Sequence, residues 1–427
     1  MSKNDGNNII FCCSIVTGCL CCTFIVSMIV AGLSNPSRTC FDASFVNISN
    51  NATFGVGGSS VALTCAGQQV VVGVTSGGDG IVEVAQLAYS NNSYVQTQTI
   101  EPPILNVSGA FGTTIATDCH AMLAVGEPLV NSSSGRVHLF NRSVDSTDIS
   151  SNYAPLLILD NPEGISSPDL FGLSLAFACH APWLAVGAPA FDADSGRVYI
   201  FSGNTTTWSL IETIDRPTAN ITSGMAQFGA ALALSCDAHV LVVGAPNDNR
   251  VAVFARSDTE TPFVLDRILS SPPPSQVNSR FGASVAQASR GSIIVVGAPL
   301  FDSLNETLID AGAVFRFDDD DDDANATSIL EGTVEDAHFG RSVSVNHDAT
   351  RLLVGDNATA LVFQYSSSSQ YTPDTQAFAQ ITEFGGERVA SSFGGHEMAT
   401  TLTAHDNSTQ LAYLDCWKRR GSVCPSC

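Results

Sequence analysis

Aspartates in short loops are the residues of this sequence whose type and spacing fit cation binding. Asp192 and Asp194 alternate in the segment Asp-Ala-Asp-Ser-Gly, as the ligands of a calcium loop do. The segment lacks a downstream bidentate acid, and calcium prefers six or more oxygen ligands, so an ordinary polar turn competes with a weak calcium site here. Asp302 and Asp310 share a longer loop, where they could bind a cationic group of a partner, and Asp248 stands in a third loop of this kind.

A second acidic feature is the run of aspartates at residues 318–323. Mutual repulsion of these carboxylates predicts a solvated hairpin tip, with loose binding of divalent cations as the functional alternative. No nucleophile elbow, His-Glu-X-X-His, phosphate loop or paired-acid motif occurs in a recognisable context. We therefore expect a protein that is not an enzyme, and no cofactor other than calcium is indicated.

Cysteines recur at one position of a repeated pattern. Cys119, Cys179 and Cys236 each lie eight residues after a phenylalanine, and Cys65 occupies the matching place upstream. The histidines beside them are His120, His180 and His239. Disulfides need the cysteines only in pairs, whereas zinc needs four converging ligands, so we expect disulfides and keep zinc as the alternative.

Composition excludes nucleic acid as a partner. The formal net charge is −23, with 41 acidic residues against 18 lysines and arginines. Such a surface repels phosphate backbones.

An uncharged apolar stretch at residues 9–33 is long enough to cross a bilayer as a helix, after a tail of residues 1–8. A cleaved signal peptide is the alternative, although its apolar core is usually shorter. Five further cysteines lie in this stretch, where they could be acylated or simply pack in lipid: Cys12, Cys13, Cys19, Cys21 and Cys22.

All Asn-X-Ser/Thr sequons follow this stretch, which favours a type II protein with a lumenal or extracellular C-terminal domain, at the cell surface or in a virion envelope. The acceptors are Asn47, Asn51, Asn91, Asn106, Asn131, Asn141, Asn204, Asn220, Asn305, Asn325, Asn357 and Asn407. Cys40, Cys416, Cys424 and Cys427 share this compartment with the repeat cysteines, so they are further candidates for disulfides.

The elements that must position these residues come from an internal repeat. Phe-Gly pairs begin at Phe54, Phe111, Phe171, Phe228, Phe281, Phe339 and Phe393. Each unit continues with an alternating strand, a tight turn, an apolar strand that ends in Val-Gly-Ala-Pro or a variant of it, a loop, and two further strands. Four strands per unit and no sustained helical periodicity predict an all-β, seven-bladed β-propeller over residues 54–415, behind the N-terminal transmembrane helix.

The repeated Phe-Gly and Gly-Ala-Pro resemble FG-GAP repeats, the units of the integrin α-subunit head. The resemblance implies a membrane-anchored surface glycoprotein whose propeller binds an extracellular protein or glycan through the loops between blades and after Gly-Ala-Pro. It departs from the family in one respect: the turn between the first two strands is too short to hold the usual calcium loop. A carbohydrate-active hydrolase or lyase and a structural coat protein remain the alternatives.

Closure of the ring needs a strand from the other end of the chain. The last unit is short of an outer strand before the tail at residues 416–427, and residues 40–48, within the linker at 34–53, form a strand-compatible segment. We expect this segment to complete the last blade and to bring Cys40 near Cys416, Cys424 or Cys427. In a propeller the repeat cysteines would pair between neighbouring blades, Cys65 with Cys119 and Cys179 with Cys236.

Overall fold

The computed structural model of this chain consists almost wholly of antiparallel strands. The residues that it describes are 42–46, 58–65, 67–75, 79–88, 93–103, 109–119, 121–142, 152–165, 167–217, 224–271, 278–288, 291–304, 307–318, 326, 328–357, 359–366, 370–373, 385–391, 397–403 and 409–415. Helix within these residues is limited to single turns in loops, namely α2 (Val130–Ser133), α3 (Phe191–Asp194) and η1 (Pro246–Asp248).

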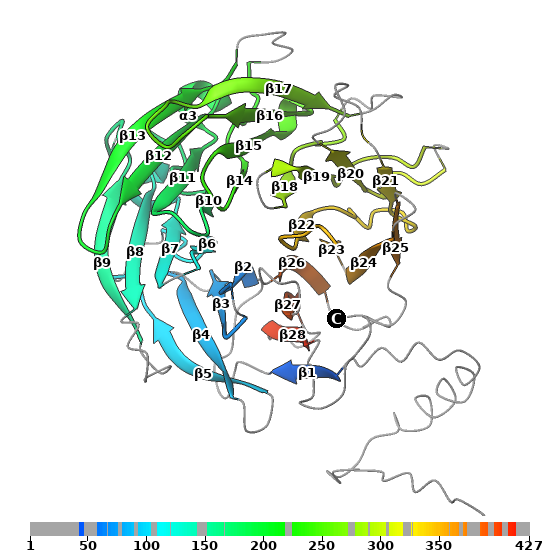
Figure 1. Ribbon diagram of the computed structural model, residues 1–427, viewed down its shortest axis with the longest axis horizontal. Coiled ribbons are helices and arrows are strands. Elements are labelled where there is room, and N and C mark those ends of the chain that lie inside the picture. The colour runs from blue at the N-terminus through cyan, green and yellow to red at the C-terminus, as the bar shows by residue number, and fades with distance from the viewer. Residues whose placement is uncertain are drawn as a thin grey trace, which may run out of the picture.

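Six blades are each formed from four consecutive strands (Figure 1). Blade 1 contains β2 (Gly58–Leu63), β3 (Gln69–Val74), β4 (Ile81–Ala88) and β5 (Ser93–Ile100), and blade 2 contains β6 (Thr114–Thr117), β7 (Met122–Glu127), β8 (Arg136–Arg142) and β9 (Tyr153–Asp160). Blade 3 contains β10 (Ser174–Phe177), β11 (Trp183–Ala188), β12 (Arg197–Gly203) and β13 (Trp208–Asp215), and blade 4 contains β14 (Ala231–Leu234), β15 (Val240–Ala245), β16 (Arg250–Ala255) and β17 (Val264–Ser270). Blade 5 contains β18 (Ser284–Gln287), β19 (Ile293–Ala298), β20 (Ala313–Asp318) and β21 (Ser328–Glu331), and blade 6 contains β22 (Ser342–Val345), β23 (Arg351–Gly355), β24 (Ala360–Ser366) and β25 (Gln370–Pro373). The first strand of each blade is nearest the axis and the fourth forms the rim.

A further four-stranded sheet, which we call the closing sheet, joins the two ends of the described chain. It contains β26 (Gly385–Ser391), β27 (Glu397–Thr403) and β28 (Thr409–Asp415), with β1 (Asp42–Val46) as its outer strand. β1 pairs antiparallel with β28, so that Ala43 lies opposite Leu414, and β26 lies against β2 on one side and β22 on the other. The expectation that the segment at 40–48 supplies a closing strand is confirmed.

The all-β propeller of four-stranded blades is confirmed, but its units are not alike. The sequence predicted seven blades, the last of them completed by the segment at 40–48. The structure has six blades of consecutive strands, and the closing sheet combines β1 with the last three strands. The physical reason is the open edge that a ring of consecutive strands would leave between its first and last blades.

The second strands show why the sequence folds in this way. β3, β7 and β11 are apolar or small at nearly every position, and all six residues of each are buried. Both faces of such a strand are covered, because the core lies between neighbouring blades: Leu139 of blade 2 and Leu184 of blade 3 belong to one cluster. Continuous apolar runs of this length are therefore the expected sequence for these strands.

Each Phe-Gly pair connects its own blade to the preceding one through the glycine. The Gly172 amide donates a hydrogen bond of 3.0 Å to the Gly187 carbonyl in blade 3, while the Gly172 carbonyl accepts one of 2.7 Å from the Thr114 hydroxyl in blade 2. A Cβ atom on Gly126 of blade 2 would overlap the Gly172 carbonyl oxygen. The same set of contacts recurs at Gly112, Gly229 and Gly340.

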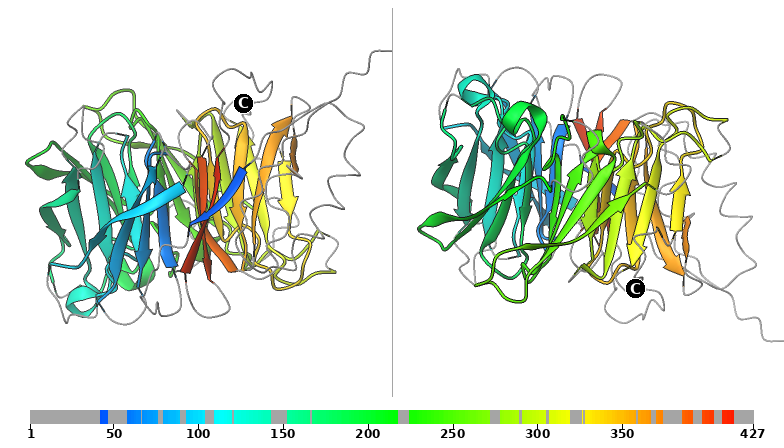
Figure 2. Two further views of the ribbon diagram at one scale, coloured as in Figure 1. Left: turned by 90° about the horizontal axis from the view of Figure 1, so that it is seen from below. Right: turned by 90° about the horizontal axis from the view of Figure 1, so that it is seen from above.

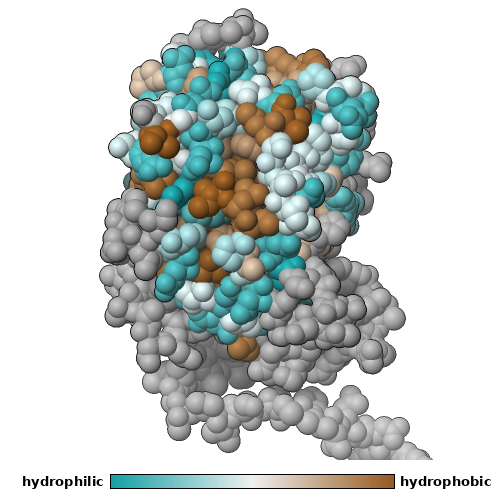
Figure 3. Space-filling view, turned by 90° about the vertical axis from the view of Figure 1, so that its left-hand side faces the viewer, coloured by the Kyte–Doolittle hydropathy of each residue, from teal (hydrophilic) through white to brown (hydrophobic). Residues whose placement is uncertain are grey.

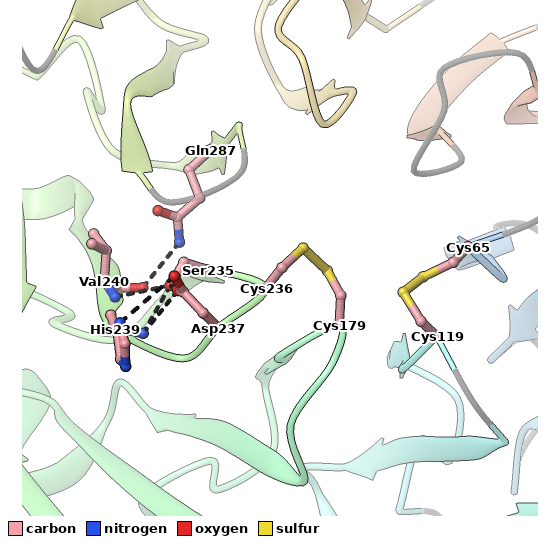
Figure 4. The surroundings of a disulfide bond; sticks show 9 residues. All are labelled: Cys65, Cys119, Cys179, Ser235, Cys236, Asp237, His239, Val240 and Gln287. Atoms are coloured by element: carbon pink, nitrogen blue, oxygen red, sulfur yellow. Dashed lines mark hydrogen bonds and ion pairs between the residues drawn. A yellow bond between two sulfur atoms is a disulfide. The ribbon is translucent and has the colours of Figure 1, made fainter. Parts of the chain in front are cut away.

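Two disulfides join neighbouring blades through the turns between their first and second strands (Figure 4). These turns lie at the opposite end of the strands from the Gly-Ala-Pro loops. Cys65 pairs with Cys119 and Cys179 with Cys236, with Cα atoms 4.9 Å and 4.2 Å apart. Both predicted pairings are confirmed. The zinc alternative is wrong for these cysteines, because a thiol in a disulfide cannot act as a thiolate ligand.

Main-chain hydrogen bonds extend this connection beyond the disulfides. The Cys119 amide donates to the Cys179 carbonyl at 3.2 Å, and the His180 amide donates to the Cys236 carbonyl at 3.0 Å. The turns of blades 1 to 4 near the axis therefore form one connected arc, in which disulfides and hydrogen bonds alternate.

The apolar stretch at residues 9–33 lies outside the described residues, as do the cysteines at both chain ends: Cys40, Cys416, Cys424 and Cys427. In the part of the chain that the structure describes, no helix has the length and apolar character needed to span a membrane.

Replacing Gly187 with alanine should destabilise the protein by about 1 to 3 kcal/mol, because the new methyl group would overlap the Gly229 carbonyl of the next blade. Thermal unfolding followed by circular dichroism measures the change. Gly224→Ala is the matched control, since a Cβ there meets no atom of the described residues within 4 Å, and its midpoint should stay within the error of the wild type. Equal midpoints for the two variants would contradict the interlock.

A chain that begins at residue 42 should keep its closing strand, whereas one that begins at residue 47 loses β1 and exposes the edge of β28. We expect the shorter chain to melt several degrees lower and to aggregate on heating, because it has lost a whole outer strand. Light scattering during a thermal ramp measures both effects. Identical melting of the two chains would show that β1 does not close the ring.

Candidate functional site

One face of the ring, called the Gly-Ala-Pro face below, carries the loops between second and third strands and the links into each following blade. Figure 2 shows the ring edge on, with loops at both ends of its strands. All five aspartates predicted as binding residues lie in loops of this face, in blades 3, 4 and 5. The structure places them in different environments.

Asp192 and Asp194 lie in α3, where Asp192, Ala193 and Asp194 have φ angles of 48°, 53° and 69°. The main chain of this turn is used for packing: the Asp194 carbonyl accepts a hydrogen bond of 2.8 Å from the Gln227 amide of blade 4. Among the described residues, no third carboxylate, histidine or cysteine joins these two acids in a metal-binding group. Asp192 is exposed, so a calcium ion there would need most of its ligands from water.

Asp248 is not available to a partner, contrary to expectation. It is buried in an ion pair with Arg216, and the two side chains are 4% and 8% exposed. This pair joins η1 of blade 4 to the link that leaves blade 3. The role of this pair is structural, because removal of either side chain would leave the other as an uncompensated charge inside the protein.

Asp302 and Asp310 do come together, but Asp302 is used within its own loop. The Asp302 carboxylate accepts a hydrogen bond of 2.9 Å from the Asp310 amide. The Asp310 carboxylate instead faces two residues that the sequence analysis did not single out, Asp336 and His338, and potential ligand atoms of these three side chains all lie within 4.8 Å of one another. The signal that could have found His338 is its place directly before a Phe-Gly pair.

Hydrogen bonds around His338 weigh against a metal at this cluster. The Asn357 amide oxygen accepts from Arg341 at 2.9 Å, so its nitrogen points the other way, to the Asp336 carbonyl at 3.0 Å and to His338 Nδ1 at 2.8 Å. An amide nitrogen can only donate, which makes Nδ1 the acceptor and leaves the proton of the neutral ring on Nε2. The Nδ1 atom of His338 is therefore occupied by Asn357 and does not serve as a metal ligand.

A pocket of about 510 Å³ opens around the axis of the ring. Its lining comes from all six blades of consecutive strands, with Val61, Ile115, Leu175, Ala231, Val285 and Val343 among the residues of the first strands. The residues before and after three of the Phe-Gly pairs also line it: Leu170, Leu173, Gln227, Ala230, Arg280 and Ala283. A cavity of this size is typical of small-ligand sites.

One backbone conformation recurs before the Phe-Gly pairs, and three of the five residues that adopt it line this pocket. The residue before each of five Phe-Gly pairs is left-handed, with φ between 55° and 57°, and its carbonyl accepts a hydrogen bond from the amide three residues on. These five residues, called the turn ring below, are Ala110, Leu170, Gln227, Arg280 and His338. Left-handed φ is costly for residues other than glycine, yet side chains are retained at every one of these positions.

Two blades carry an acid in place of the alanine of Gly-Ala-Pro, Glu127 in blade 2 and Asp356 in blade 6. Glu127 is fully buried in blade 2, with one carboxylate oxygen 2.6 Å from Arg136 Nε and 2.7 Å from His138 Nε2. Burial alone raises the pKa of Glu127, but the hydrogen bonds from His138 and Arg136 outweigh it and hold this pKa below its ordinary value. A depressed carboxyl pKa stabilises the fold above pH 4.5, and this stabilisation is lost as the pH falls through the lower folded-state pKa.

A separate exposed surface lies on the rim. Ile158 of β9 and Leu210 and Ile211 of β13 are 39%, 41% and 54% exposed. Figure 3 faces this side and shows apolar side chains gathered among polar ones. These strands also present open edges, so the rim of blades 2 and 3 is the second surface of the molecule with the character of a contact site.

No protein-family model matches this chain, and no curated protein matches it either.

Glu127→Ala should destabilise the protein by about 3 to 5 kcal/mol at pH 7, although alanine is the residue found here in blades 3, 4 and 5. The reason is the buried Arg136, which would lose its counter-charge. The double variant Glu127→Ala/Arg136→Ala should recover part of the loss. Urea unfolding measures both, and it should also show that the wild type loses its advantage over Glu127→Ala as the pH is lowered below 4.5. A double variant no more stable than the single one would refute the ion-pair account.

Proposed function

We propose that this chain is a membrane-anchored surface glycoprotein with an FG-GAP, integrin-α-like propeller, which binds an extracellular protein or glycan through its Gly-Ala-Pro face. The observation that carries the proposal is the turn ring. Its backbone is the same in five blades, whereas its side chains range from methyl to guanidinium. A conserved backbone with differing side chains around a pocket is the arrangement that a recognition surface needs.

The packing of the ring of blades does not account for these side chains. Main-chain atoms hold these turns to their neighbours, as in the bonds from the Leu170 amide to the Ser133 carbonyl at 2.8 Å and from the Gln227 main-chain amide to the Asp194 carbonyl at 2.8 Å. One side-chain bond joins two of these turns, from Arg280 to Gln227 at 3.2 Å. Glycine would satisfy the main-chain bonds without the cost of a left-handed side chain. Retention of alanine, leucine, glutamine, arginine and histidine therefore supports a role in binding.

Some predicted glycan acceptors fit this proposal better than others. Asn131 and Asn204 are exposed. The side-chain oxygen Oδ1 of Asn204 accepts hydrogen bonds from the Thr206 and Thr207 main-chain amides, so the side-chain nitrogen Nδ2 is the atom that would carry a glycan. Asn357 is a poor site for a glycan, because its side-chain nitrogen donates hydrogen bonds to the Asp336 carbonyl and to His338 Nδ1. Glycans at Asn131 and Asn204 would leave the pocket side of blades 4 to 6 open.

A binding experiment on the full-length protein tests the proposal. The protein is applied to a glycan array and to panels of cell-surface proteins, and a polysaccharide turnover screen is run in parallel. We expect retention of a partner, at least tenfold weaker after Leu170→Asp in the turn ring and unchanged after Glu260→Ala, an exposed residue in a hairpin of the opposite face. Turnover of a polysaccharide without a retained partner would favour an enzyme, and equal binding by the two variants would exclude the Gly-Ala-Pro face.

A further inference from the structure

The axial pocket has an unusual charge for this protein. Arg280 is the one ionisable side chain among the described residues that line it, although acids outnumber lysines and arginines by 41 to 18 in the whole chain. A cation in this position attracts anions locally, while the acidic remainder of the surface repels them. Among the described lining residues, Arg280 therefore offers a local point of attraction for a small anion.

Arg280 also differs from other arginines in its contacts. Arg197 bonds to Glu163 and Asp215, and Arg216 bonds to Asp248, so these charges are neutralised within the protein. Arg280 is exposed, and within the described residues its side-chain hydrogen bond goes to a neutral group, the Gln227 amide oxygen, at 3.2 Å. The guanidinium can donate five hydrogen bonds. Because the side-chain oxygen of Gln227 accepts from Arg280, its NH₂ group is a further donor beside the guanidinium.

One position beside Arg280 breaks the hydroxyl pattern of the first strands. Ser60, Thr114, Ser174 and Ser284 each donate to the Phe-Gly glycine carbonyl of the following blade, at 2.6 to 2.8 Å. In blade 4 the equivalent residue is Ala231, which lines the pocket. Among the described residues, the Gly282 carbonyl therefore lacks the hydroxyl donor that its counterparts have, only two residues from Arg280.

These observations define a site between blades 4 and 5 with a cation and an amide donor, next to Ala231, whose missing hydroxyl leaves the Gly282 carbonyl without the donor of its counterparts. We infer that this site binds a carboxylated sugar, a uronic or sialic acid unit, with its carboxylate on Arg280 and Gln227 and a hydroxyl group directed to the Gly282 carbonyl. Guanidinium and carboxylate match in a bidentate pair, and the acceptor calls for a hydroxyl near the acid group. Leu170 and Leu173 of blade 3 offer an apolar wall to the face of the sugar ring.

Two features favour a sugar acid over an acidic peptide. The pocket volume of about 510 Å³ accommodates one or two sugar units, and the small side chains of Ala230 and Ala283 leave room for a ring close to the strands. An acidic side chain of a peptide would pair with Arg280 but would bring no hydroxyl for Gly282. The inference rests on the proposed binding function of the Gly-Ala-Pro face and names its ligand class.

Ligand-observed NMR titration of the full-length protein tests the inference. The probes are glucuronate and N-acetylneuraminate, with glucose as the neutral control and the dipeptide Asp-Gly as the acidic peptide. We expect the two sugar acids to bind and to weaken with added salt, and glucose to bind at least tenfold more weakly.

Variants locate the binding. Arg280→Gln should weaken the sugar acids at least tenfold, and Arg267→Gln, which removes the same charge from β17 on the rim, should leave them unchanged. Ala231→Ser restores the hydroxyl of the other blades, so it should also weaken binding while the melting temperature stays equal or rises. Loss of binding in a variant that still melts like the wild type cannot be attributed to misfolding.

Three results would overturn the inference: no binding of either sugar acid, equal binding of glucose, or unchanged binding in Arg280→Gln. A preference for Asp-Gly would replace the sugar with an acidic peptide as the ligand. Failure of the inference is distinguishable from failure of the proposed function. If the array partner is retained by Arg280→Gln, the face binds but not through this site; if no array partner binds at all, the NMR titration still reads the pocket directly.

Discussion

The contact on which the rest of the structure depends is the one between the Phe-Gly glycine of one blade and the Val-Gly glycine of the blade before it. The carbonyl of the first lies where a side chain of the second would be, and a hydroxyl from the preceding blade bonds to the same carbonyl. A side chain on the Val-Gly glycine would overlap this carbonyl, so main-chain atoms alone set the spacing between neighbouring blades. The turn that precedes each Phe-Gly pair is then held in place, and the left-handed residues Leu170, Gln227 and Arg280 line the axial pocket.

Closure follows from a different physical constraint. A ring held by pairwise contacts between neighbours has two free ends, and each end is a strand edge open to aggregation. β1 removes this problem by pairing with β28, while the disulfides and the hydrogen bonds between them connect the turns of blades 1 to 4 on the opposite face. The two devices act on different parts of the ring.

Much of this was predictable because repeats report on main-chain geometry. The Phe-Gly spacing predicted the strands, the recurrence of Cys65, Cys119, Cys179 and Cys236 predicted the disulfide pairs, and the unpaired segment at 40–48 predicted the closing strand. The roles of the site residues were harder to predict, because the loop sequences do not follow the repeat. Asp248 looks like a loop acid in the sequence, and only its contact with Arg216 reveals a buried pair.

The turn ring is a second feature that the sequence predicted only in part. Arg280 and His338 stand directly before Phe-Gly pairs in the sequence, but a left-handed φ cannot be read from residue types that usually avoid it. The missing hydroxyl at Ala231 was visible in the sequence, yet its meaning depended on knowing that its counterparts bond to the next blade. The position of each residue within the repeat was predictable from the sequence. Its backbone conformation and the partners of its side chain were not.

Hydrogen–deuterium exchange of the full-length protein, with and without a bound partner, tests the central claim most directly, because it maps protection onto the backbone without any substitution. The account predicts slowed exchange in peptides that cover the turns at Leu170, Gln227, Arg280 and His338, with no change in the turns that carry the disulfides. Protection confined to the disulfide-bearing turns or to the rim strands β9 and β13 would contradict it.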